Sequence, residues 1–89
     1  MHAVVVRVTV SDHEAATNEL REQVVPAVSQ APGFVAGYWT CKEGSDQGLS
    51  MVVFESEDAA NETARRMPEM APEAVTIDDV EVREVVASA

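Results

Sequence analysis

The stretch from Ala31 to Trp39 is where the chain changes from a helical pattern to a strand pattern. Pro32-Gly33 stops the helix, because proline lacks a backbone donor and glycine tolerates the turn that follows a helix. The strand that starts at Phe34 carries three of the four aromatic residues in the chain. The other elements must therefore be arranged on either side of this point.

The part before this point is predicted to be a strand followed by a helix. Ala3 to Val10 is almost continuously apolar and rich in β-branched residues, which is typical of a strand with both faces at least partly buried. The Ser11-x-x-Glu14 spacing predicts a capping box and a helix that begins near Asp12. An apolar stripe then recurs every three or four residues up to Ala31, and Pro26 is expected to kink or split this helix.

The part after it is predicted to contain two more strands, a second helix and a last strand. Phe34 to Cys41 and Leu49 to Glu55 read as strands joined by the polar turn Lys42 to Gly48. Ser56 is expected to cap a helix that Pro68 closes, and Val75 to Val86 is expected to form the last strand.

This order predicts an α+β fold, a ferredoxin-like βαββαβ sandwich in one domain over residues 1–89. Its four-stranded antiparallel sheet carries both helices on one face. The first and third strands are apolar on both sides, however, and two helices cover only one of them. We therefore predict a homodimer held by sheet-on-sheet packing.

Composition limits the partners and the compartment. A net charge of −10, with sixteen acidic residues distributed along the whole chain, argues against nucleic acid and anionic membranes as partners. No apolar run approaches the roughly 20 residues of a membrane span. Cys41 is the single cysteine and no signal peptide is recognised at Met1, so we expect a cytoplasmic protein and interpret Cys41 as a small buried residue.

Four segments of the chain resemble one group of proteins. They are Val24 to Ala27, Ala31 to Trp39, Phe54 to Ala60 and Val80 to Val86. Together they resemble the antibiotic biosynthesis monooxygenase-like (ABM-like) proteins of the dimeric α+β barrel superfamily, over essentially the whole chain. The resemblance implies a barrel formed by two sheets and a pocket between the helices and sheet of each subunit. The group includes cofactor-free oxygenases of aromatic substrates and haem-degrading enzymes.

This chain lacks the functional side chains of the haem-degrading members of the group. The haem-degrading pattern has an Asn on the first strand, a Trp at the end of the third and a His about ten residues later, and these positions correspond to Val6, Phe54, and Ala64 or Arg65. Val6 cannot form the hydrogen bond of the Asn, and Phe54 lacks the indole N–H of the Trp. Neither Ala64 nor Arg65 can bind iron as the His does. The departures argue against haem degradation, and we expect no cofactor and no metal site.

The same resemblance divides the strand residues between two faces. The pocket candidates are Val6, Tyr38, Trp39, Val52 and Phe54. The candidates for the dimer face are Val5, Arg7, Leu49, Met51 and Val53. Hydrophobicity alone would instead place Leu49 and Met51 on the side of Val4 and Val6. Tyr38 and Trp39 point to opposite faces, so at most one lines a pocket, and the sequence leaves open which one does.

The histidines and the acidic groups are the remaining candidates for a catalytic or metal-binding role, and each also has a simple structural interpretation. His2 could act as a general base if it lies at a pocket mouth, but an inert, solvated histidine is the commoner case, and the same holds for His13. The acidic groups Glu55 to Asp58 and Asp78-Asp79 lack the spacing of a calcium loop and are interpreted as solvated edges.

Two functional hypotheses remain open. The first is a dimeric protein that binds a small hydrophobic or aromatic molecule between helices and sheet. The alternative is a cofactor-independent monooxygenase acting on an aromatic or quinol-like substrate, which needs few recognisable residues. A pocket in which Trp39 or Tyr38 converges with another polar group would favour the enzyme. A pocket lined by valine, methionine and phenylalanine side chains would favour binding. An RNA-binding module is disfavoured by charge and by the lack of basic residues beside Val52 to Phe54.

Overall fold

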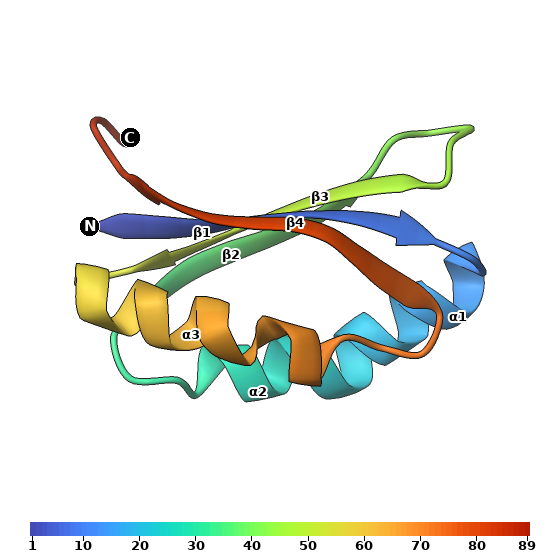
Figure 1. Cartoon of the computed structure of the whole chain (residues 1–89), viewed down its shortest axis with the longest axis horizontal. Helices are drawn as coiled ribbons and strands as arrows, with labels where there is room; N and C mark the ends of the chain where they lie inside the picture. Colours follow the sequence, from blue (N-terminus) through green and yellow to red (C-terminus); the bar gives the residue numbers. More distant parts are fainter.

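The four strands form one antiparallel sheet with the helices on one face. In the computed structural model, which describes residues 1–89, the strands are β1 (His2–Val10), β2 (Phe34–Cys41), β3 (Gln47–Phe54) and β4 (Val75–Glu84). Their spatial order is β2-β3-β1-β4, so the valine-rich β1 and β3 occupy the centre. Figure 1 shows the helices below the sheet and no element above it. The predicted ferredoxin-like α+β fold is confirmed.

The helix before Ala31 consists of three consecutive segments. These are α1 (His13–Glu19), the π-helical η1 (Leu20–Val24) and α2 (Val25–Ser29). Pro26 cannot donate a backbone hydrogen bond, and just before it the N–H of Val25 donates to the carbonyl of Leu20, five residues earlier. The predicted disturbance at Pro26 is therefore a local widening, after which Val28 continues the buried face.

Two predicted helix ends need correction. Asp12, not Ser11, caps α1: its carboxylate accepts from the Ala15 N–H at 3.1 Å, while the Ser11 hydroxyl donates to the Ala74 carbonyl at 3.2 Å. Ser11 thus ties the helix start to the start of β4. Pro68 does not end α3 (Glu57–Met70), because its ring angle suits a helix and the turn that contains it packs Met67 and Met70 against the core.

The core lies between the sheet and the helices. Its buried members are Val4, Val6, Val52 and Phe54 from the strands and Val24, Val28, Ala60 and Met67 from the helices. The pairing of β1 with β3 sets these residues opposite one another, with Val4 facing Val52 and Val6 facing Ser50. This is the face assignment that the resemblance implies, and not the one that hydrophobicity alone favours. None of the helices is both long and apolar enough to cross a lipid bilayer.

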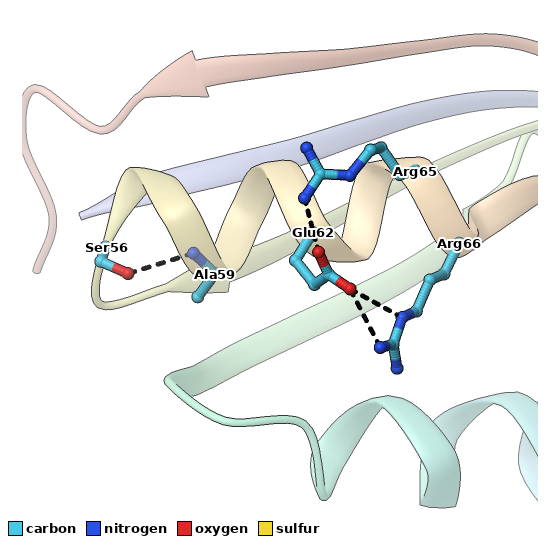
Figure 2. A network of polar contacts seen from close by, with 5 residues as sticks. All are labelled: Ser56, Ala59, Glu62, Arg65 and Arg66. Atoms are coloured by element: carbon cyan, nitrogen blue, oxygen red, sulfur yellow. Dashed lines mark hydrogen bonds and ion pairs between the residues drawn. The ribbon is translucent and has the colours of Figure 1, made fainter.

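A polar network fixes the outer side of α3 (Figure 2). Ser56 caps the helix as predicted, since its hydroxyl accepts from the Ala59 N–H at 3.1 Å. Further along, the Glu62 carboxylate accepts from the guanidinium groups of both Arg65 and Arg66. The hydrogen bond and positive charge of Arg65, followed by the charge of Arg66, lower the pKa of Glu62 below its ordinary value.

The lowered pKa of Glu62 has a consequence for stability. Because this pKa is lower in the folded chain than in the unfolded one, the network stabilises the fold above the unfolded pKa, and this contribution is lost as the pH falls through the folded pKa. We expect Arg65→Ala to move the Glu62 titration back toward the ordinary value, as followed by carboxyl-carbon NMR between pH 2 and pH 7. An unchanged titration curve in Arg65→Ala would contradict this assignment.

Candidate functional site

An apolar cleft lies between the sheet and the helices, toward the end of the sheet that carries the β2–β3 hairpin. Figure 1 shows this hairpin at the end of the sheet away from the two chain termini. The sheet side of the cleft is formed by Val6, Val8, Trp39 and Ser50, among others, and its helix side includes Leu20, Met67 and Met70. The cavity volume is about 60 Å³. This is room for a few water molecules and less than the roughly 300–1,000 Å³ of a formed ligand pocket. A ligand must therefore displace side chains, and methionine side chains adapt readily.

Gly37 determines where the Trp39 ring lies. A Cβ atom at Gly37 would come within 2.7 Å of Cη2 and 2.9 Å of Cζ3 of Trp39, distances that real Cβ atoms do not tolerate. The six-membered ring of the indole therefore rests over the bare backbone of Gly37. The register shift between β2 and β3 lies at the start of β2, between Phe34 and Ala36, and so does not involve Gly37.

Ser50 places a polar group on the floor of the cleft. It lies opposite Val6 on β1 and opposite Trp39 on β2, so it occupies the helix-facing side between these two residues. Its side chain is half-buried, and its hydroxyl makes no hydrogen bond within the chain. The indole N–H of Trp39 also lacks an acceptor within the chain. Sequence reasoning missed Ser50, because nothing in the local pattern distinguishes it from the other serines.

The predicted pocket residues do not all line this cleft. Val6 and Trp39 contribute to its wall. Val52 and Phe54 face the helices too, but both are completely buried in the core beside it. Tyr38 lies on the opposite face of β2 and is 68% exposed, because neighbouring residues of a strand alternate between faces. The strand thus resolves which of the two aromatic residues reaches the cleft.

No charged side chain lines the cleft. His2 lies at the far end of β1 with Nε2 3.4 Å from the Glu57 carboxylate, and its buried Nδ1 has no hydrogen-bond partner. His13 is exposed at the first turn of α1. No group of three or more His, Cys, Asp or Glu side chains is arranged to hold a metal ion.

Cys41 corrects the sequence interpretation. We expected a buried residue, but Cys41 is exposed, at the rim of the cleft. It is the last residue of the edge strand β2, which pairs with β3 on one side and has no strand on the other.

The face of the sheet away from the helices carries the predicted dimer-face residues. Val5, Met51 and Tyr38 form a row across β1, β3 and β2, and Arg7 and Leu49 form the next row toward the hairpin. Leu49 is 41% and Met51 44% exposed, while the small Val5 is covered by its neighbours. The fifth residue, Val53, lies opposite Ala3. The part of this outer face over β2 and β3 is therefore mainly apolar and open in the single chain, while Arg7 and, from β4, Asp79 and Glu81 add charges beside it.

The fold also occurs in a solved structure. No family model and no curated protein sequence matches the chain. Among solved structures, the chain is similar to the haem-degrader MhuD from Mycobacterium tuberculosis, in a structure with two haems bound in its active site. The TM-score is 0.54 at 23% sequence identity, over 97% of this chain and 98% of that one. The chain thus has the same fold as this haem-degrader, a four-stranded antiparallel sheet with helices on one face.

The cleft does not fit a haem group. The positions of the haem-degrading pattern hold Val6 and Phe54, both buried in the core. The positions about ten residues later hold Ala64 and Arg65, and Arg65 is exposed and bound to Glu62. None of these side chains is an iron ligand, and the cleft contains no histidine or tyrosine. Cys41, Met67 and Met70 could ligate iron by their chemistry, but none stands at a position of the pattern, and a cavity of about 60 Å³ is much smaller than a formed ligand pocket.

The contact between Gly37 and Trp39 can be tested with one substitution. Gly37→Ala should push the indole ring from its place and destabilise the fold by about 1–3 kcal/mol, as overpacking typically does. Urea denaturation measures the loss, and the emission maximum of the single tryptophan reports the shift. Val35→Ala, at an exposed position of the same strand, should leave the emission unchanged. A Gly37→Ala protein with native emission and stability would disprove the contact.

Proposed function

We propose that the protein binds a small, uncharged, mainly apolar molecule, such as an aromatic ring compound, in the cleft between its helices and sheet. The observation that carries this proposal is the composition of the cleft wall: Trp39, Leu20, Met67 and valines, with no charged side chain. A buried anion or cation would have no partner there, which makes binding of a charged ligand costly. The net charge of −10 further disfavours anions.

The C-terminal end of α3 is the part of the cleft wall that is best suited to move. Pro68 leaves the last turn without one backbone donor, and the half-buried Met70 and Ala71 follow it at the rim. Movement of these residues enlarges the cleft without disturbing the strands, which form its other wall. Such a cleft admits a ring-sized ligand while remaining closed without it.

We further propose that two chains pair through the outer face. The exposed Leu49, Met51 and Tyr38 and the neighbouring Val5 form an apolar surface on a sheet that no helix covers. Burying this face against a second copy removes its apolar area from water and supplies core that a chain of 89 residues lacks. A reducing cytoplasm, which suits an exposed and unpaired Cys41, completes the proposal.

A cofactor-independent monooxygenase is the second candidate. The observation that favours it is the position of Trp39 beside Ser50, since two residues with hydrogen-bonding side chains are cross-strand neighbours in an apolar cleft. The cleft contains no histidine or carboxylate that could act as a base, so the substrate would have to arrive in a readily ionised form. Oxygen consumption with a bound aromatic substrate distinguishes this candidate from binding alone.

Occupation of the cleft can be tested with naphthalene as the probe. We expect saturable binding in equilibrium dialysis and a rise in melting temperature with ligand concentration, because the ligand binds only the folded chain. Ala71→Phe should fill the rim and reduce binding at least tenfold. Ala87→Phe introduces the same side chain at an exposed position and should bind like the parent protein. Equal binding by both variants would place the ligand elsewhere.

The dimer can be tested with a charge on the outer face. Met51→Glu puts a carboxylate at the centre of the proposed interface, where its desolvation opposes association. We expect sedimentation equilibrium to give a dimer for the parent protein and a monomer for this variant. Val86→Glu, at an apolar position that is 86% exposed, should remain dimeric. A monomeric parent protein at micromolar concentration would refute the proposal.

A further inference from the structure

Ser50 is the one polar side chain in the middle of the helix-facing side of the sheet. Its cross-strand neighbours are Val6 and Trp39, and the next residue on the same face of β3 is the fully buried Val52. Polar residues on this side of the sheet are otherwise confined to its far end, where His2 lies opposite Glu84. A hydroxyl group thus interrupts an apolar surface at the floor of the cleft.

This hydroxyl is not used by the fold. Ser50 makes no side-chain hydrogen bond, whereas the Thr40 hydroxyl on β2 donates to the Leu49 carbonyl at 2.6 Å. The hydroxyl is half-buried and open to the cleft, and the fold would lose no side-chain hydrogen bond if it were removed. A polar group that faces an apolar cleft and has no partner in the fold is available to a ligand, which can supply that partner.

We infer that the cleft takes an uncharged ligand that is apolar except for one hydroxyl or carbonyl group, and that Ser50 hydrogen-bonds to that group. This inference rests on the binding function proposed above. The ring of the ligand lies against Trp39 and the methionines of α3, and its oxygen atom lies over β3. Ser50 is then a specificity-determining residue, because a site built around a hydroxyl discriminates against a ligand that lacks the matching group.

The experiment compares two ligands and two proteins. Naphthalene and 2-naphthol share a ring and differ by one hydroxyl, and Ser50→Ala removes the hydroxyl of the protein. Affinities follow from the Trp39 indole N–H signal in NMR titrations. We expect the parent protein to prefer 2-naphthol by about three- to tenfold, the ratio that one hydrogen bond supplies. Ser50→Ala should bind both ligands with the affinity that the parent has for naphthalene.

Control measurements separate this role from a structural one. Ser50→Ala should be at least as stable as the parent protein in urea, and Ser29→Ala, an exposed serine on α2, should keep the preference for 2-naphthol. A preference that survives in Ser50→Ala, equal binding of both ligands by the parent protein, or a destabilised Ser50→Ala would overturn the inference while the binding function stands. Binding of neither ligand by the parent protein would overturn both.

Discussion

The pairing register of β1 against β3 is the constraint on which the other features depend. Both strands are apolar on their two sides, so hydrophobicity permits either face to turn toward the helices. A slip of one residue would exchange the faces completely. The observed register sets Val4 against Val52 and Val5 against Met51, which buries the first pair under the helices and leaves Met51 on the open side. Core, cleft and outer face all follow from this choice.

The cleft lies beside the part of the sheet where the helices pack most tightly. Small residues such as Ala60 and Thr63 let α3 lie close to one end, where Phe54 and Val52 are fully buried. Toward the hairpin, β1, β2 and β3 extend further, and the gap below them is bordered by the flexible side chains of Met67 and Met70. The tightest packing and the cleft therefore lie on one continuous face.

Several features were predictable because they depend on neighbours in the sequence. The strand–helix order, the Ser56 cap and the disturbance before Pro26 depend on periodicity, capping chemistry and a missing backbone donor. Other predictions failed where distant residues compete. Ser11 bonds to Ala74 across the fold and leaves the cap to Asp12, and Cys41 is exposed because β2 is an edge strand. Neither the hydrogen bond to Ala74 nor the edge position of β2 can be recognised from neighbouring residues in the sequence.

The sequence alone determined the fold class and showed that the central strands are apolar on both faces. Both features depend on residue alternation and turn chemistry, which act over a few neighbouring positions. The position of Ser50 beside Trp39 and the separation of Tyr38 from the cleft were decided only in three dimensions. Strand pairing joins residues that are 11 to 44 positions apart, Trp39 with Ser50 and Val6 with Ser50, and no local pattern records which partners meet.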